Sequence, residues 1–450
     1  MRFQRFLIAA LAVASLSVAA ADEVFPGFEA LRADRQAAAK YMLQHLEVYW
    51  KADPAPTAPR TAKIVYFHAG DRQPLKDYDT RINGWMADFE MFYRAEFKRN
   101  GFGEHELALE RTPEGRVKIH VVKGQKPDVN PNYKPEVPAA PLKPGEKPKL
   151  NMDKSYNYES GNQIRMEAAA AVKSDFDLDN ETALIICALS CTDDKGKINL
   201  YAPFYGIGLG SNRKGACLCV DHELLDVKNF PANEPRIEIL EHKDRVMSLG
   251  EFNTTYLGGA LHEFGHGLSL PHDHETADER ALGTPLMGAG NYTYRQETRD
   301  KNRKGTYLSF SEAVRLISNP LFCGHNRDLL VRPRLEHKGI AFTEENGRLV
   351  IRGQLESDIP AYAVIAYNDD AAIDADYDAQ TWTSVVNEKG EFEIVVGGLR
   401  PGKFELRLTA CHMNGATTPL WGIPNKYTHS GKGQPLQFEA PVFRGYYRGR

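Results

Sequence analysis

The chain has 450 residues, with 56 Lys or Arg against 60 Asp or Glu and a formal net charge of −4 at pH 7. This balance, without a basic stripe interleaved with aromatic side chains, argues against nucleic acid as a partner. The length suits two or three domains. After the amino terminus no segment approaches the run of about 18 apolar residues that a membrane helix needs.

Residues 1–21 have the pattern of a secretory signal peptide. Arg2 and Arg5 give a positive start, residues 6–18 are the apolar core, and the small residues at 19–21 suit a cleavage site. We therefore expect a secreted or periplasmic protein with no membrane span after signal cleavage. The alternative is an anchor that is retained uncleaved.

Residues 22–60 are predicted to form an N-terminal helix, over residues 27–50, and a proline-rich linker. This helix either packs on the following domain or belongs to a removable pro-segment. The apolar periodicity then predicts strands at 63–68, 116–122 and 182–189, and helices at 80–99, 159–172 and 309–318. Residues 123–149, rich in Pro and Lys, are predicted to be a loop, and residues 195–220 an irregular hairpin or edge strand.

The six cysteines are an even number in a chain with an export signal, which favours disulfides. We expect Cys187 and Cys191 to pair with Cys217 and Cys219, in a connectivity that the sequence leaves open. The remaining two, at 323 and 411, would bridge two domains if they were paired. A structural metal site or buried, reduced thiols are the alternatives.

The most informative segment is residues 262–272, which contains three histidines and a glutamate. His262 and His266 are four residues apart, so on a helix they lie on one face and can bind one ion. The helix must end before Pro271, and a turn there lets His272 return as a third ligand. Three imidazoles with one open position suit a catalytic Zn²⁺. Glu263 is then placed to act as a general base on the water of the metal.

These residues resemble the metzincin zinc endopeptidases, whose pattern HExxHxxGxxH is followed by a methionine turn. By this resemblance His262, His266 and His272 are the metal ligands, Glu263 is the catalytic base, and residues 285–288 are similar to the Met-turn, with Met287 beneath the zinc. The segment is also similar to that of a family of proposed secreted metallopeptidases. The resemblance implies an α+β catalytic domain over residues 61–332, with a twisted mixed sheet, an active-site helix and a Met-turn subdomain.

One position departs from the metzincin pattern, because Ser269 stands where the pattern has glycine. The backbone turns there through positive φ, which costs a non-glycine residue roughly 1 kcal/mol. The approach of His272 depends on this turn, and His274 is the spare candidate for the third ligand.

After about residue 335 the chain changes to short apolar strands separated by turns such as Glu388-Lys389-Gly390. Residues 338–450 are predicted to form an all-β sandwich of the immunoglobulin or fibronectin kind. Such a domain is either a spacer or a module that docks a polymeric or cell-surface substrate.

We therefore expect a secreted zinc metalloendopeptidase that acts on protein or peptide substrates. Tyr292 or Tyr294, which follow the Met-turn, could add a hydrogen bond at the reacting centre or simply pack. A zinc hydrolase or deacylase of non-peptide amides would need the same metal and base. A catalytically inactive, surface-binding protein is the third hypothesis, and a buried cluster of hydrogen-bonded histidines is the plainest alternative for the motif.

Overall fold

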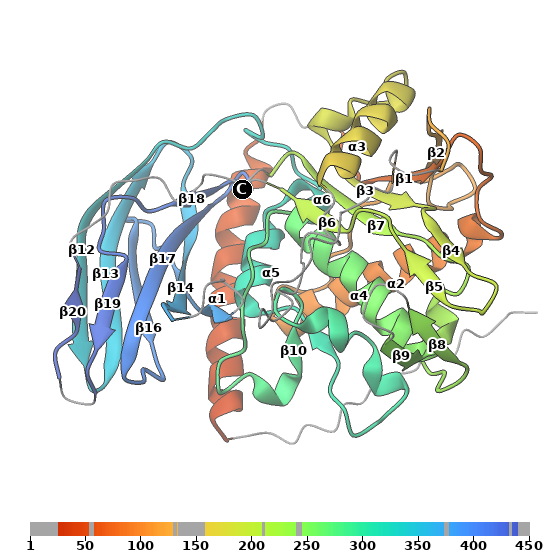
Figure 1. Cartoon of the computed structure of the whole chain (residues 1–450). Helices are drawn as coiled ribbons and strands as arrows, with labels where there is room; N and C mark the ends of the chain where they lie inside the picture. Colours follow the sequence, from red (N-terminus) through yellow and green to blue (C-terminus); the bar gives the residue numbers. More distant parts are fainter. Residues whose placement is uncertain are drawn as a thin grey trace, which may run out of the picture.

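The computed structural model describes residues 26–53, 58–128, 133, 158–208, 212–239, 245–372, 378–431 and 434–439. The predicted signal peptide and most of the loop predicted at residues 123–149 lie outside these ranges. No helix within them has the length and apolar character that a membrane crossing needs. The described chain combines sheets and helices, as the predicted α+β class requires (Figure 1).

A five-stranded mixed sheet forms the centre of the larger part of the molecule, in the order β2-β1-β3-β7-β6 (Figure 1). Its strands are β1 (Lys63–His68), β2 (Ile119–Lys123), β3 (Thr182–Cys187), β6 (Tyr205–Ile207) and β7 (Gly215–Val220). All are parallel to their neighbours except β6, which pairs antiparallel with β7 and is an edge strand. The edge strand therefore comes from the segment 195–220 in which the sequence analysis placed it.

Helices cover both faces of this sheet. α3 (Tyr158–Val172) lies on one face, and α2 (Tyr78–Arg99) and α4 (Leu249–Gly267) lie on the other (Figure 1). A second sheet of four strands beside them consists of β4 (Ser190–Thr192), β5 (Ile198–Leu200), β8 (Arg236–Ile239) and β9 (Arg245–Ser248). The chain after α4 is largely irregular and includes β10 (Thr284–Pro285), β11 (Thr306–Tyr307), α5 (Phe310–Ile317) and α6 (Pro320–Cys323).

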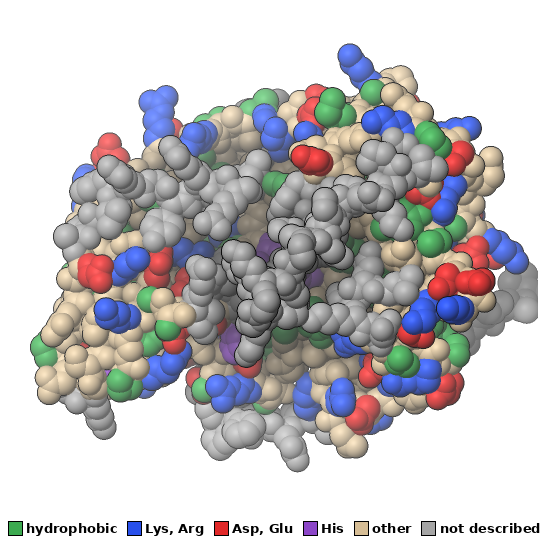
Figure 2. Space-filling view, viewed as in Figure 1, with side chains coloured by type: hydrophobic (Ala, Val, Ile, Leu, Met, Phe, Trp, Pro, Cys, Tyr) green, Lys and Arg blue, Asp and Glu red, His purple; other side chains and the backbone are tan. Residues whose placement is uncertain are grey.

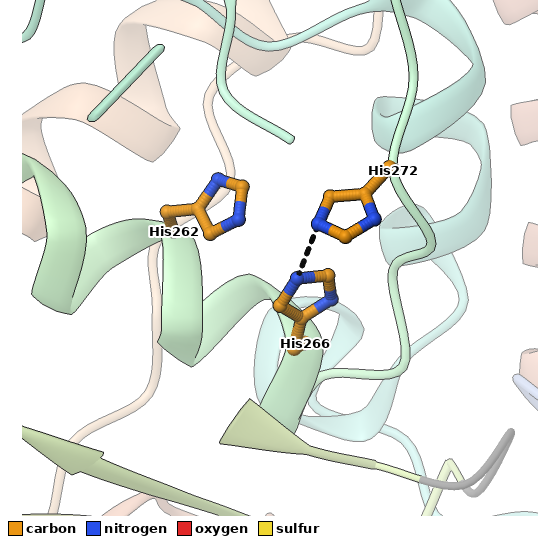
Figure 3. Close-up of side chains that lie close together, drawn as sticks. All are labelled: His262, His266 and His272. Atoms are coloured by element: carbon orange, nitrogen blue, oxygen red, sulfur yellow. Dashed lines mark hydrogen bonds between the residues drawn. The ribbon is translucent and has the colours of Figure 1, made fainter. Parts of the chain in front are cut away.

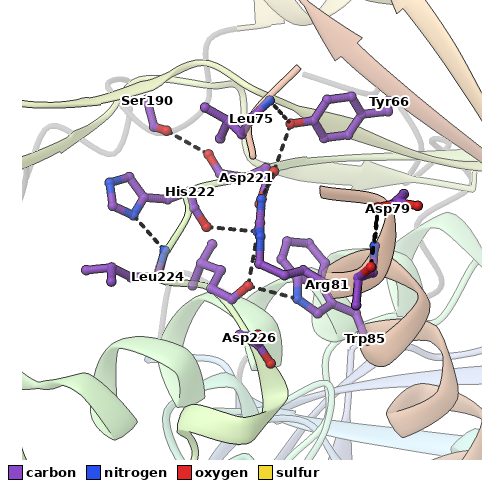
Figure 4. Close-up of polar contacts among 12 residues, drawn as sticks. Tyr66, Leu75, Asp79, Arg81, Trp85, Ser190, Asp221, His222, Leu224 and Asp226 are labelled. Atoms are coloured by element: carbon purple, nitrogen blue, oxygen red, sulfur yellow. Dashed lines mark hydrogen bonds and ion pairs between the residues drawn. The ribbon is translucent and has the colours of Figure 1, made fainter. Parts of the chain in front are cut away.

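A buried ion pair fixes α2 against the end of β7 (Figure 4). The guanidinium of Arg81 donates to both carboxylate oxygens of Asp221, at 2.5 and 2.8 Å, and the hydroxyl of Tyr66 donates to the same carboxylate at 2.9 Å. A buried charge needs such partners, because burial removes it from water. The loop that follows is tied to α4, since the side chain of Asn253 accepts from the backbone N–H of Asp226 at 2.7 Å.

The carboxyl-terminal residues form two sheets with a common apolar core. One sheet contains β12 (Leu335–Glu345), β13 (Arg348–Ser357) and β16 (Glu391–Val396). The other contains β14 (Ala361–Asp370), β15 (Gln380–Val385), β17 (Gly402–His412), β18 (Thr417–Pro419), β19 (Lys426–His429) and β20 (Gln437–Phe438). We call these residues, 335–438, the C-terminal β unit. Its classification as an immunoglobulin-like or fibronectin-like sandwich stays a prediction.

Strand β14 is buried on both faces, which joins the C-terminal β unit to the rest of the chain. Side chains alternate between the faces of a strand. Val364 and Ala366 therefore pack in the core between the two sheets, whereas Ala363 and Ile365 belong to the core of the larger part. Removing the larger part would expose this second face, so the unit is not simply tethered by a linker.

Helix α1 (Pro26–Lys51) lies between the larger part and the C-terminal β unit (Figure 1). It contacts β14 and β15, and Met42 and Leu46 are fully buried in the main core. Arg35 donates to Glu279 at 2.7 Å, beyond the candidate metal-binding helix. This burial favours the first of the two alternatives for the N-terminal helix, packing on the folded protein, over a removable pro-segment.

The disulfides expected from the sequence are not formed, and all six cysteines are free thiols. Cys219 is in register with Ile186, the residue before Cys187. Because neighbouring residues of a strand point to opposite faces, Cys187 points away from the face that carries Cys217 and Cys219. The thiol of Cys217 instead approaches the carbonyl of Ala260 on α4, at 3.7 Å.

Candidate metal centre

Helix α4 carries the first two histidines, and its ends are set by local sequence. Ser248 caps its N-terminus in a reciprocal capping box with Glu251. The helix therefore begins at Leu249, and the polar residues Asn253 and Thr254 are buried within it. Its last residue is Gly267, as the downstream Pro271 requires.

The turn after α4 passes through the left-handed region at Ser269, whose φ is 68°. The sequence analysis expected this conformation at the position where the metzincin pattern has glycine, and the serine adopts it. The carbonyl of Ser269 accepts a hydrogen bond from Arg315 at 2.7 Å. This bond offsets part of the cost of the turn, which then returns His272 to α4.

His262, His266 and His272 come together, with potential ligand atoms all within 4.8 Å of one another (Figure 3). The Nε2 atoms of His266 and His272 are 3.1 Å apart. Two nitrogen ligands of one tetrahedral zinc lie about 3.3 Å apart, given Zn–N bonds of about 2.0–2.1 Å. In Figure 2, which is viewed as Figure 1, histidine atoms lie recessed near the middle of the face toward the viewer. The alternative His274 faces elsewhere, with Nδ1 3.3 Å from the carboxylate of Glu275.

Backbone carbonyls fix the tautomers of the two helical histidines. Nδ1 of His262 lies 2.7 Å from the carbonyl oxygen of Leu286, and Nδ1 of His266 lies 2.9 Å from that of Leu270. A carbonyl oxygen can only accept, so each Nδ1 carries the proton and each Nε2 carries a lone pair. Burial also lowers the pKa of His262 to about 3, with the charges of His266 and His272 adding to the shift. These are the properties of a neutral imidazole ligand.

Glu263 is buried beside the edge strand β6. Burial raises the pKa of its carboxyl group to about 8, opposed by a hydrogen bond from the backbone N–H of Gly206. Residue 206 must be small, because a Cβ atom there would lie 1.7 Å from the carbonyl oxygen of Glu263. The carboxyl group of Glu263, next to His262 in sequence, thus meets the backbone of the edge strand.

Met287 is fully buried against α4. A Cβ atom on Gly265 would lie 2.4 Å from its sulfur, so the helix needs glycine at this contact. The backbone N–H of Met287 donates to the carboxyl group of Glu312 at 2.9 Å. The residue before it supplies the carbonyl that orients His262, so this segment holds the histidine cluster as well as packing against it.

Sequence reasoning missed a buried acidic pair next to the third histidine. Asp273 accepts from the hydroxyl of Ser309 at 2.5 Å, and Glu312 accepts from the backbone N–H of Ser309 at 2.5 Å. Burial raises the pKa of Asp273 to about 7, and the charge of Glu279 adds to this shift. Burial also raises the pKa of Glu312 well above its usual range, with the charge of Asp273 adding to it. The capping-box pattern of Ser309 and Glu312 can be recognised in the sequence, whereas the contact of Glu312 with Met287 cannot.

The two tyrosines considered from the sequence lie in different surroundings, and only Tyr294 has its hydroxyl engaged in the interior. The hydroxyl of Tyr294 donates to Asp88 at 2.5 Å in the interior, and its ring packs on Phe89 and Phe92. Tyr292 has an exposed fraction of 54%.

No protein-family model matches the chain, and neither does any curated protein. Solved structures of OgpA from Akkermansia muciniphila are similar to it. A wild-type crystal form has a TM-score of 0.62 at 24% identity, covering 82% of this chain and 95% of that one; a second has a TM-score of 0.62 at 25% identity, covering 82% and 94%. Catalytically inactive OgpA in complex with an O-glycopeptide substrate, glycodrosocin, has a TM-score of 0.62 at 24% identity, covering 84% and 98%. The fold is thus shared over most of both chains.

Proposed function

We propose that this chain is a zinc-dependent endopeptidase in which His262, His266 and His272 hold Zn²⁺ and Glu263 is the general base. The observation that carries the proposal is the convergence of the three imidazoles, two of them with their protons directed at carbonyls, beside a buried carboxyl group. The donor set fits zinc, which favours nitrogen ligands and leaves a fourth position open in catalytic sites.

When bound, Zn²⁺ would polarise the scissile carbonyl and lower the pKa of a water molecule. Glu263 would accept the proton of the attacking water and deliver it to the leaving amine. A cation held by the neighbouring histidines favours the ionised form of this carboxyl, which burial alone disfavours. The N–H of Gly206 supports the same ionised form.

The edge strand β6 provides a place for an extended substrate. Among the described residues it pairs only with β7, so its other edge can add a peptide by backbone hydrogen bonds. The similarity to OgpA supports a peptide substrate, because that protein takes an O-glycopeptide. We include O-glycosylated peptides in the proposed substrate class.

Several finer assignments belong to the same proposal. They are the metzincin layout, the role of Met287 as a Met-turn residue, export through a signal peptide at residues 1–21, and a division into a catalytic domain at 61–332 and a β-sandwich domain at 338–450. The packing of Met287 against Gly265 on the metal-binding helix supports the second of these.

Cleavage of a diverse peptide mixture by the purified protein would test the proposal, with Glu263→Gln and Glu263→Ala run in parallel and zinc counted in each. Glutamine keeps the volume of the side chain but cannot take up a proton. We expect cleavage to fall by about 10²–10⁴-fold while zinc stays near one ion per chain. Full zinc without cleavage by any form would favour the non-peptide hydrolase or the inactive binding protein. Absence of zinc from the wild-type protein would overturn the proposal.

A further inference from the structure

A cleft extends from the histidine cluster to the C-terminal β unit. Its volume is about 760 Å³, and it is lined at one end by His266 and at the other by residues of β17, β18 and the segment that leads into β12. Gly206 and Ile207 of the edge strand line the same cleft. A peptide added to β6 would therefore continue into a space whose far wall is the C-terminal β unit.

The wall of this cleft is positively charged. Arg213, Arg315 and Arg332 line it, and among the described lining residues there is no Asp or Glu. Arg315 is held in place by Ser269 and by the hydroxyls of Tyr367 and Thr417. Arg332 is exposed, and within the described ranges of the chain it has no ion-pair partner. It is thus the guanidinium that a ligand can reach.

An apolar surface accompanies this charge. Trp421 has an exposed fraction of 49%, Leu330 of 75% and Val331 of 41%, and all three line the cleft. Arg332 directly follows Val331. An exposed indole and a guanidinium that line one cleft suit a ligand that has an apolar stem or a sugar ring and ends in an anion.

The direction of the substrate follows from the strand. Antiparallel pairing is the more stable arrangement. A peptide paired in this way runs in the direction opposite to β6. The part of the peptide that lies toward Gly208 is therefore its N-terminal part. Gly208 and Asn212 line the cleft, and the side chain of Asn212 donates to the carbonyl of Asn414 in the C-terminal β unit at 2.5 Å. The residues that reach this wall are therefore those N-terminal to the scissile bond.

We infer that Arg332, in the segment that leads into β12, and Trp421 of the C-terminal β unit form a subsite for a carboxylate carried by the substrate on the N-terminal side of the scissile bond. This inference rests on the proposed endopeptidase function. The carboxylate can belong to an Asp or Glu side chain or to an acidic sugar of a glycopeptide. The C-terminal β unit thereby takes part in substrate selection next to the histidine cluster and is not a separate docking module.

The test uses a peptide that the full-length protein cleaves, with Glu or Gln placed in turn at each position on either side of the scissile bond. Two further peptides contain Gln in place of Glu and an O-glycosylated threonine. The O-glycan is sialylated in one of them and uncharged in the other. We expect wild-type kcat/KM to be about tenfold higher with a carboxylate at one N-terminal position, the size of effect of one charge-assisted hydrogen bond. The Glu and sialylated arms identify the source of the carboxylate.

Arg332→Gln should remove this preference, whereas Arg334→Gln should keep it. Arg334 is a matched control because it lies two residues away, has a side chain with an exposed fraction of 92% and does not line the cleft. An equal rate for Glu and Gln peptides in the wild-type protein, or an unchanged preference in Arg332→Gln, would overturn the inference.

A binding measurement separates this inference from the proposed function. Labelled mixtures of Glu and Gln peptides are titrated with metal-loaded Glu263→Ala protein, with and without Arg332→Gln, and followed by fluorescence anisotropy. Tighter binding of the Glu mixture that Arg332→Gln abolishes supports the subsite even when the wild-type protein cleaves no peptide. Equal binding of both mixtures rejects the subsite even when peptides are cleaved.

Discussion

The carboxylate of Glu312 accepts a hydrogen bond from the backbone N–H of Met287 at 2.9 Å. The same side chain accepts from the N-terminal residue of its own capping box, Ser309. One buried glutamate thus joins the start of α5 to the segment that presents the Leu286 carbonyl to His262. It is a link between a helix cap and the candidate metal centre.

Glu312→Ala should weaken both the fold and metal binding. It leaves two buried N–H groups without an acceptor, which costs roughly 2–5 kcal/mol in the free energy of unfolding. Glu251→Ala is the matched control, because it removes the capping-box glutamate of α4 without touching Met287, at a cost of about 1 kcal/mol. Zinc affinity, measured by competition with a chelator, should fall only in Glu312→Ala. Equal affinities would show that the link does not support the metal site.

Ser269→Gly should be tolerated and Ser269→Val should not. The residue has a φ of 68°, which glycine adopts freely and a β-branched residue adopts with strain. We expect Ser269→Val to lower the melting temperature and reduce zinc affinity, because the turn delivers His272. Ser269→Gly should bind zinc at least as tightly as the wild-type protein. Full zinc affinity in the valine variant would refute a role for this turn in placing the third histidine.

Because of His222, we expect the free energy of unfolding to decrease when the pH falls into the mildly acidic range. Burial, with the charge of Arg81 adding to it, lowers the pKa of His222 from 6.5 to about 4, and its Nδ1 accepts from the N–H of Leu224 at 3.2 Å (Figure 4). As the pH falls, the unfolded chain binds the proton near pH 6.5, whereas the folded chain does so only near pH 4. The stability contribution is therefore complete above pH 6.5 and is lost between these values, by up to about 3 kcal/mol.

Denaturant unfolding at several pH values checks this expectation. The free energy of unfolding of His222→Gln should depend less on pH between 6.5 and 4 than that of the wild-type protein, with both measured in the same metal-free buffer. Glutamine can still accept the Leu224 hydrogen bond but does not titrate. Identical slopes for the two proteins would mean that His222 has the same pKa in the folded and unfolded states, contrary to this expectation.

All six cysteines should react with an alkylating reagent after unfolding without reductant, because the structure contains only thiols. Burial raises the pKa of Cys187 and Cys217 well above the usual value, so in the folded protein these two should react far more slowly than Cys191, which is partly exposed. Mass spectrometry counts the labels. If the number of labels per chain is lower than six by two or four, and rises to six after reduction, the protein contains disulfides.

Much of the local structure could be predicted from the sequence. The stretch from His262 to Pro271 fixed where α4 ends, because proline excludes the helix, and the spacing of four residues placed two histidines on one face. The positive φ at Ser269 followed from a motif position. The apolar runs that became β1, α2 and β3 were equally visible, since burial on a strand or a helix leaves an apolar pattern in the sequence.

The tertiary structure decided what depends on distant contacts. Cys187 and Cys219 are on opposite faces because of the register between β3 and β7, and the sequence of neither strand contains that register. The carbonyl of Leu286 orients His262 and the amide of Gly206 meets Glu263 only after the chain has folded. Arg332, distant from the motif in sequence, lines the cleft that begins at His266 because β14 packs against both parts of the molecule. Local patterns specify which side chains share a face, whereas packing between elements determines which faces meet.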